Sequence, residues 1–183
     1  MITTEQIKEL RDLTGISVMQ CKKALEEAGG DKEKALEILR QKSSDIAAKK
    51  GDRELGAGAI QAYIHSNKNV GALVELSCET DFVARNEEFV AMARDIAMHI
   101  TAGAPEFLDG SEVTDEKRAE IKASLGEGAT DDQVAVYITE KTLLAQSFIK
   151  NPELTIKGLV DGGVQKFGEK IAVSRFVRFS VVK

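Results

Sequence analysis

The chain has 183 residues, of which 43% are hydrophobic and 30% are charged, and its formal net charge is −5. This length suffices for one ordinary domain and a small module, and the composition is that of a soluble globular protein. The acidic balance argues against a broad nucleic-acid-binding surface, which is normally basic. We therefore expect a protein partner or a small ligand, and no direct contact with nucleic acid.

Cysteine usage, hydropathy and motif spacing exclude further classes of protein. Cys21 and Cys78 are too far apart for a metal knuckle or a CxxC redox pair, and too few for a disulfide framework. Residues 1–11 carry charges in an amphipathic pattern, so they do not predict a signal peptide, and no later run approaches a membrane span. The GxG at 56–58 lacks the flanking residues of a phosphate-binding loop. We expect a cytoplasmic protein that binds no cofactor, metal or membrane.

The first part of the chain predicts a module of three short helices. Thr3 with Gln6, and Ser17 with Gln20, have the spacing of capping boxes, in which a hydroxyl accepts from a free N–H at a helix start. Hydrophobic residues recur at spacings of three or four: Ile7, Leu10, Leu13, Val18, Cys21, Leu25, Ala35, Ile38 and Leu39. Three such stripes can share one small core. We predict an N-terminal domain over residues 1–42.

A polar stretch and then a hairpin follow this module. Residues 43–54 form either a linker or a solvated helix. After them the pattern changes to strand periodicity, with strands predicted at 57–65 and 70–78 and turn formers at 66–69. Alternate residues of the second strand share one face: Val70, Ala72, Val74, Leu76 and Cys78. We expect helices to cover that face.

Helix signals dominate the middle of the chain. Asn86 can cap a helix whose first turn is acidic. Acidic side chains there interact favourably with the positive end of the helix dipole. The hydrophobic stripe of that helix is Phe89, Ala93, Ile96, Ala97 and Ile100. Further helices are predicted at 115–125 and after Thr130, which has Gln133 at the capping-box position.

The last part of the chain predicts a short helix and a strand. The helix, near 154–167, ends at Gly168. The strand, over 171–181, alternates so that six residues share one side: Ile171, Val173, Arg175, Val177, Phe179 and Val181. Residues 55–183 are therefore expected to form an α+β core, in which a small antiparallel sheet packs with helices.

The most distinctive stretch, residues 78–86, lies between a predicted strand and a predicted helix. By residue type alone, Phe82 reads as a core residue and Asp81 as a cap. Cys78 with His65 or His99 as a base would suggest a thiol enzyme, but a cysteine within a strand pattern is usually an inert buried thiol. Residue types alone therefore give this stretch no function.

The same stretch resembles a known family. Thr80–Ala84 reads TDFVA, which is similar to the signature of the elongation factor Ts family. Other segments resemble that family in the same order along nearly the whole chain: Arg11–Gly15, Cys21–Ala28, Ala47–Lys50, Ile96–Ile100, Pro105–Phe107, Gln146–Ile149 and Arg175–Phe179. Several specific segments in one order make a chance match very improbable.

The resemblance implies a nucleotide exchange factor and not an enzyme. Such a protein binds the GTPase elongation factor Tu, both GDP-bound and nucleotide-free, and promotes GDP release during polypeptide elongation. The resemblance also implies that the N-terminal helices are a ubiquitin-associated-like (UBA-like) module that docks on the GTPase domain. It implies that Thr80, Asp81, Phe82 and Val83 reach the nucleotide site. An aromatic ring on a tight turn can wedge between helices, and a nearby carboxylate can disturb a magnesium–phosphate network.

Contact residues elsewhere follow from the same resemblance. Arg11, Val18 and Met19 match positions through which the family's module contacts the GTPase. The family often has two methionines followed by aspartate there, whereas this chain has Val18, Met19 and Gln20, so a branched side chain replaces a flexible thioether. The alternative for Val18 and Met19 is packing in the core of the module. His65 lies in a segment similar to a sheet region that faces the GTPase, and is a secondary contact candidate.

Two further hypotheses concern partners. The runner-up function is a helical adaptor without exchange activity, in which the N-terminal module recognises some other protein. Single-sheet members of the family can pair, and the C-terminal strand offers an edge through which a homodimer can form.

Overall fold

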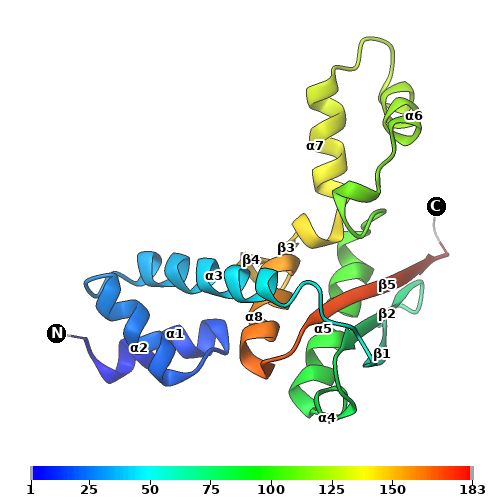
Figure 1. Ribbon diagram of the computed structural model, residues 1–183. Helices are drawn as coiled ribbons and strands as arrows, with labels where there is room; N and C mark the ends of the chain where they lie inside the picture. The colour runs from blue at the N-terminus through cyan, green and yellow to red at the C-terminus, as the bar shows by residue number, and fades with distance from the viewer. Residues whose placement is uncertain (1, 182–183) are drawn as a thin grey trace. The chain divides into compact units, whose positions relative to one another are not determined.

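The structure is a computed structural model that describes residues 2–181. It is an α+β fold, as predicted, with a three-stranded antiparallel sheet in the order β1-β2-β5 and a separate β3-β4 pair (Figure 1). The elements are α1 (Thr4–Thr14), α2 (Val18–Glu27), α3 (Lys32–Lys49), β1 (Ala57–Ile64), β2 (Val70–Cys78), α4 (Asp81–Ala84), α5 (Glu87–Gly103), η1 (Gly110–Glu112), α6 (Asp115–Leu125), α7 (Asp131–Lys141), η2 (Leu143–Ala145), β3 (Ser147–Phe148), β4 (Asn151–Thr155), α8 (Ile156–Phe167) and β5 (Ile171–Ser180). None of the helices within residues 2–181 is long and apolar enough to cross a membrane.

The chain divides into two compact units whose boundaries cut through several elements. The first unit comprises residues up to 58, 77–89 and 158–172, and the second comprises 59–76, 90–157 and residues from 173 onward. Within the polar stretch, residues 43–49 continue α3 as a helix, in which Ser43 is buried. The predicted domains, with boundaries at 42 and 55, remain a prediction.

The first unit contains the three N-terminal helices. Thr3 forms the predicted capping box with Gln6, but Ser17 forms only half of one, because the side chain of Gln20 meets the Ser17 hydroxyl and not its backbone N–H. The helices enclose a core of eight buried residues: Leu10, Ile16, Cys21, Ala24, Leu25, Ala35, Leu36 and Leu39. Val18, predicted in that core, is exposed instead; it shares a helix face with buried Cys21 and Leu25, but it is the first residue of α2.

Two other parts of the chain complete this unit. The ring of Phe89, at the start of α5, meets the ring of Phe167, at the end of α8, edge to face at 5.9 Å. Such aromatic pairs stabilise a contact beyond the area that they bury. Lys166 forms an ion pair with Glu88 at 2.9 Å beside them. These contacts join the segment around α4 to the C-terminal end of α8.

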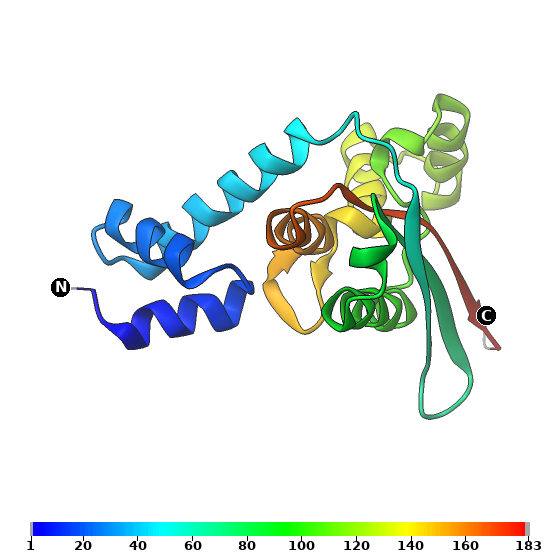
Figure 2. The same ribbon diagram turned by 60° about the horizontal axis from the view of Figure 1, so that its bottom comes forward.

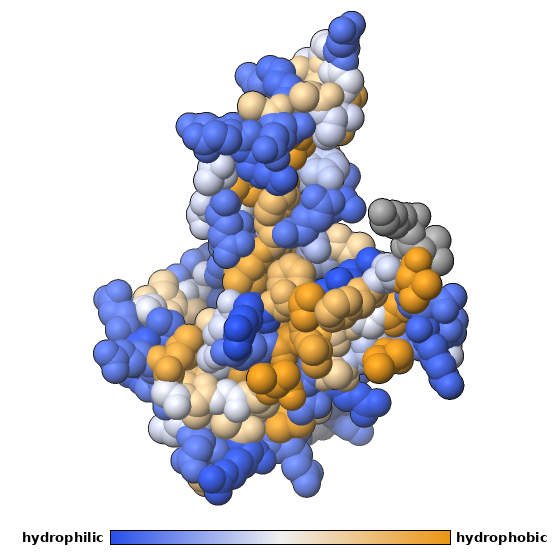
Figure 3. All heavy atoms as spheres, turned by 90° about the vertical axis from the view of Figure 1, so that its right-hand side faces the viewer, coloured by the Kyte–Doolittle hydropathy of each residue, from blue (hydrophilic) through white to orange (hydrophobic). Residues whose placement is uncertain are grey.

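The second unit contains most of the three-stranded sheet, in which the β1-β2 hairpin lies beside β5 (Figure 2). The hairpin closes where the His65 N–H donates to Val70 O at 2.9 Å, and the Val181 N–H donates to Asn69 O to align β5 with β2. On one face α5 is tied to the sheet, since Arg178 Nε donates to Thr101 O at 3.0 Å. The other face leaves hydrophobic residues exposed: Ile60, Ile64, Leu73, Val177 and Phe179 (Figure 3).

The strand prediction for 171–181 holds only in part. Of the six residues predicted to share one side, Ile171 and Val173 are buried, whereas the rest from Arg175 onward are exposed. Arg175 Nε lies 2.6 Å from Glu75 on β2, within the exposed face. The alternation is therefore correct as a strand pattern, but the cover over that side ends midway along the strand.

The β3-β4 pair was not predicted. Ser147 pairs with Thr155 and Phe148 pairs with Asn151, so the helix predicted from residue 154 begins only at Ile156. A two-residue strand is too short for an alternating pattern to reveal it. His99 of α5 anchors this hairpin: its Nδ1 accepts from the Ile149 N–H at 3.2 Å. Burial lowers the pKa of His99 below its ordinary 6.5, so the neutral ring that this bond requires is favoured.

Helices α6 and α7 form a small hairpin of their own within the second unit. Thr130 and Gln133 make the predicted capping box at the start of α7. The hairpin core consists of four buried residues: Val113, Ile121, Val134 and Ile138. This core is only about half the size of the N-terminal one, so the hairpin depends strongly on each of its members.

Candidate functional site

The TDFVA stretch forms a single short helical turn between β2 and α5. The Ala84 N–H donates to Thr80 O at 3.2 Å and the Arg85 N–H donates to Asp81 O at 3.1 Å. Val83 points inward and is 4% exposed, whereas Phe82 is 83% exposed. A large aromatic side chain on the surface is the opposite of the core position that residue type alone predicts. The turn therefore presents one ring to solvent and uses the next side chain as its anchor.

Asp81 is the charged group beside that ring. Its carboxylate lies 3.0 Å from Arg85 Nη2, one turn along, and both side chains are largely exposed. Exposed ion pairs of this kind contribute little to stability, so Asp81 is easily released to another partner. The turn thus combines an exposed aromatic ring with an available carboxylate.

The start of the turn is held from a distant part of the chain. Glu169, between α8 and β5, accepts from the backbone N–H groups of Glu79 and Thr80 at 3.1 and 3.0 Å, and from Thr80 Oγ1 at 2.6 Å. In return, the Glu79 carboxylate accepts from the Lys170 N–H at 2.5 Å and from Arg53 at 3.2 Å. The bond from Lys170 lowers the pKa of Glu79 below its ordinary 4.5.

Sequence reasoning did not identify these two glutamates. Glu79 and Glu169 are 90 residues apart, and neither belongs to a sequence motif that predicts a contact between them. Only the folded chain brings the end of β2 and the loop after α8 together. We call this arrangement of Glu79, Thr80, Glu169 and Lys170 the crossed-glutamate clamp.

Cys78, the last residue of β2, precedes the turn and is buried. Its thiol donates to Thr80 O at 3.2 Å. Burial, followed by the negative charge of Glu169, raises the pKa of the Cys78 thiol above its ordinary 9.0. A nucleophilic thiol needs a lowered pKa, so these surroundings favour a structural role for Cys78 over a catalytic one.

A second exposed hydrophobic site lies at the start of α2. Val18 is 51% exposed and Met19 is 69% exposed, because Ser17 caps the helix just before them and places both in its first turn. The alternative of core packing therefore does not hold for either side chain in this structure. Arg11, in the last turn of α1, lines the same shallow pocket as Met19, together with Ile16, Lys23 and Lys166.

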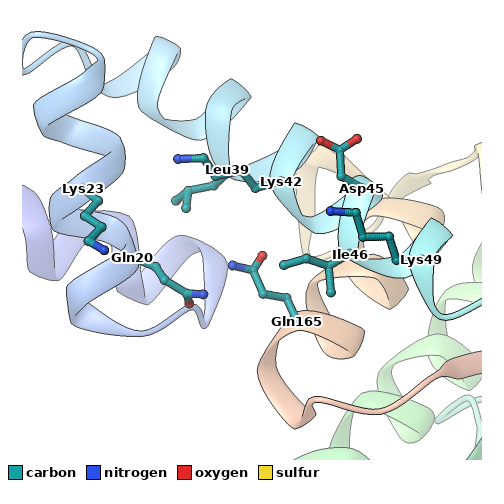
Figure 4. A pocket seen from close by; sticks show the side chains of 8 residues that line it. All are labelled: Gln20, Lys23, Leu39, Lys42, Asp45, Ile46, Lys49 and Gln165. Carbon is teal, nitrogen blue, oxygen red and sulfur yellow. The ribbon is translucent and has the colours of Figure 1, made fainter.

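A neighbouring pocket of about 310 Å³ lies between α2, α3 and α8 (Figure 4). Gln165 enters it from α8, and the Ser43 hydroxyl donates to the Gln165 side-chain oxygen. Lys23, Lys42 and Lys49 surround its apolar floor, but Lys42 is already paired with Glu27 at 2.8 Å. The lysine ammonium groups do not converge on one point, so they do not form an anion-binding site. The pocket is a gap where the three helices pack together.

His65 is the remaining candidate, and it belongs to the second unit. It is exposed at the β1-β2 turn, where Tyr63 Oη lies 3.3 Å from its Nδ1. Thr80, Asp81, Phe82 and Val83 are thus gathered on one turn, and Arg11 and Met19 line one pocket, all within the first unit. Within residues 2–181 there is no group of three or more His, Cys, Asp or Glu side chains that could hold a metal ion.

Comparison with known proteins gives a consistent result. The family model described as Elongation factor TS matches residues 45–183. The chain is 46% identical to the Elongation factor Ts of Carboxydothermus hydrogenoformans, over 99% of this chain and 89% of that protein. It is 48% identical to that of Thermodesulfovibrio yellowstonii, over 98% and 96%, and 43% identical to that of Thermosipho melanesiensis, over 99% of both chains. The chain therefore belongs to the elongation factor Ts family.

Proposed function

We propose that this protein is a guanine-nucleotide exchange factor for elongation factor Tu. It binds the GTPase with GDP or without nucleotide, promotes GDP release in the cytoplasm and makes no covalent change itself. Family membership supports this role. The observation that carries it is Phe82, which stands 83% exposed on a turn anchored by buried Val83. An exposed aromatic ring on an anchored turn is well suited to enter a pocket on another protein.

The chemistry of the turn fits disturbance of a magnesium–phosphate site. The Phe82 ring would wedge between helices of the GTPase, and the Asp81 carboxylate would exchange Arg85 for groups around the nucleotide. A thousandfold faster release requires a barrier lower by about 4 kcal/mol, which a few well-packed contacts can supply. Because coupling is reciprocal, bound nucleotide must weaken the binding of the factor in turn.

The N-terminal helices supply the second contact in this proposal, as a UBA-like docking module. Val18 and Met19 offer an exposed hydrophobic site, and Arg11 lines the adjoining pocket with a positive charge. Docking there would raise the local concentration of the Phe82 turn near the nucleotide site. His65, exposed at the hairpin turn, would add a weaker contact.

We also propose that two copies of the chain pair through the three-stranded sheet. β5 is an edge strand, and the sheet face beside it exposes Leu73, Val177 and Phe179 (Figure 3). An exposed apolar face next to an unpaired strand edge favours self-association. Light scattering at working concentration tests this: a dimer mass is expected, and a monomer mass would remove the hypothesis.

The exchange function is tested by stopped-flow release of fluorescent GDP from elongation factor Tu. Wild-type protein should accelerate release, Phe82→Ala should weaken the acceleration, and Val136→Ala, another exposed hydrophobic residue, should not. Binding without acceleration by wild-type protein would favour the adaptor. Equal rates for wild type and Phe82→Ala would remove the role of the ring.

A further inference from the structure

The crossed-glutamate clamp concentrates unusual hydrogen bonding at one end of the α4 turn. A single carboxylate, that of Glu169, accepts three bonds, two from consecutive backbone N–H groups and one from a hydroxyl. Bonds to a charged acceptor are stronger than neutral ones. The reverse bond from the Lys170 N–H to Glu79 makes the attachment reciprocal. The two loops are therefore held in one register, and neither can rotate alone.

Thr80 shows what this attachment does to the turn. A threonine at the N-cap of a helix ordinarily accepts a hydrogen bond from a backbone N–H of the first turn. Here Thr80 occupies the N-cap of α4 but makes no such bond, and its hydroxyl donates to Glu169 instead. The start of the turn is thus fixed from outside by Glu169, and not by its own cap.

A turn of four residues gains little stability from its own hydrogen bonds. Val83 anchors its inner side, but Asp81 and Phe82 project into solvent. Without the clamp, the backbone just before Asp81 would be free to take other conformations. Binding of a partner would then have to order it, and that loss of entropy reduces affinity.

The loop that carries Glu169 is itself firmly held. Lys170 Nζ donates to Gly51 O at 2.6 Å and to Arg53 O at 2.8 Å, and Lys50 Nζ donates to Gly168 O at 2.7 Å. Residues 50–53 follow α3 directly, so the clamp rests on a support that includes the end of a long helix. Because its loop is held in place, the Glu169 carboxylate can hold the backbone of residues 79 and 80 in one position.

We propose that Glu169 is a positioning residue for the Phe82 turn: it fixes Thr80 so that Asp81 and Phe82 reach a partner already in their binding conformation. This role rests on the exchange function proposed above. Glu169 itself touches neither the partner nor the nucleotide in this scheme. It acts through the backbone of Glu79 and Thr80, and through the Thr80 hydroxyl.

The test combines GDP release from elongation factor Tu with backbone amide exchange in the free protein. Glu169→Ala should speed amide exchange at residues 79–82 and lower the second-order rate constant of GDP release about tenfold, as expected for lost bonds to a charged group. Glu169→Gln, which keeps one acceptor oxygen, should recover part of both. Glu127→Ala, at an exposed glutamate between α6 and α7, is the matched control and should change neither.

A double substitution separates positioning from general damage. In the Phe82→Ala background, Glu169→Ala should have a clearly smaller effect on GDP release than in wild type, because one of the two side chains that it positions is gone and only Asp81 remains. An equal loss in both backgrounds would overturn the positioning role, as would unchanged amide exchange at 79–82 in Glu169→Ala. Failure of wild-type protein to accelerate release would instead overturn the proposed function, while the amide exchange still reports on the clamp.

Discussion

The two exposed hydrophobic sites of the first unit, Met19 on α2 and Phe82 on α4, are built in different ways. Met19 lies in the first turn of a ten-residue helix that is capped by Ser17, two residues earlier, and packed on a core of its own module. Phe82 lies on a four-residue turn that is fixed by Glu169, nearly ninety residues later. Local chemistry therefore determines one site, and a long-range contact determines the other. The first should respond to module stability and the second to the clamp.

The largest effect is expected from a substitution that unfolds the N-terminal helices and with them the Met19 site. Leu25 is fully buried in the core of the three N-terminal helices. Leu25→Ala should cost about 3–5 kcal/mol, which is most of the stability that a module of this size can hold. Amide exchange should then show loss of protection across α1–α3. Leu125→Ala, at an exposed leucine on α6, is the control, and retained protection of α1–α3 in Leu25→Ala would contradict a separate module core.

The next effect distinguishes docking from intrusion. Phe82→Ala should lower the maximal rate of GDP release by roughly 30–150-fold, equivalent to about 2–3 kcal/mol for a hot-spot ring. Met19→Ala should mainly raise the concentration that gives the half-maximal rate, by about tenfold, because a docking contact is made equally in ground and transition states. A titration of each variant against elongation factor Tu measures both parameters. If both variants change the same parameter, the two sites do not have different roles.

A smaller effect concerns the cap of α1. Thr3→Ala removes the bond from the Gln6 N–H to the Thr3 hydroxyl, but keeps the bond from the residue 3 N–H to the Gln6 side chain, and should cost about 1 kcal/mol of module stability. Urea denaturation followed by circular dichroism measures it, with Thr4→Ala beside it because Thr4 lies just inside the helix. The Phe82 turn should keep its amide protection in both variants. Loosening of residues 79–82 in Thr3→Ala would show that the two sites are not independent.

The smallest effect is the response of the clamp to acid. The folded-state pKa of Glu79 lies below 4.5, so its bond with Lys170 is fully stabilising above pH 4.5. That contribution should be lost as the pH falls through the folded-state value. The amide resonance of Lys170, followed by NMR from pH 6 downward, should therefore shift below pH 4.5. The same resonance in Glu79→Gln should stay flat, and an equal shift there would assign the titration to another group.

Local signals in the sequence predicted much of the fold. The capping residues Thr3 and Thr130 set the starts of α1 and α7 as expected, and the β1-β2 hairpin follows the strand pattern to within one residue. These features depend on neighbours within a few positions, which a sequence displays directly. The prediction failed where a strand was too short to alternate, at Ser147–Phe148, and where burial depends on what covers a strand, at Arg175 onward.

The sequence marks candidate site residues but not the contacts that hold them in place. The family resemblance marks Thr80–Val83 together as contact residues, so it implies an exposed Phe82 but does not reveal that Val83 is buried. It also gives no sign of Glu169, because a single glutamate after a helix has no distinguishing pattern. The contact exists only once two loops meet in the folded chain. Long-range polar contacts of this kind need a structure before they can be seen.

The crossed-glutamate clamp also has a consequence for how the length of the chain can vary. It joins residues 79–80 to residues 169–170, so the segment between them forms a loop whose two ends are held together. The entropy of closing such a loop grows only slowly with its length. Insertions or deletions in that segment, for example at the α6-α7 connection, would thus leave the geometry of the turn unchanged.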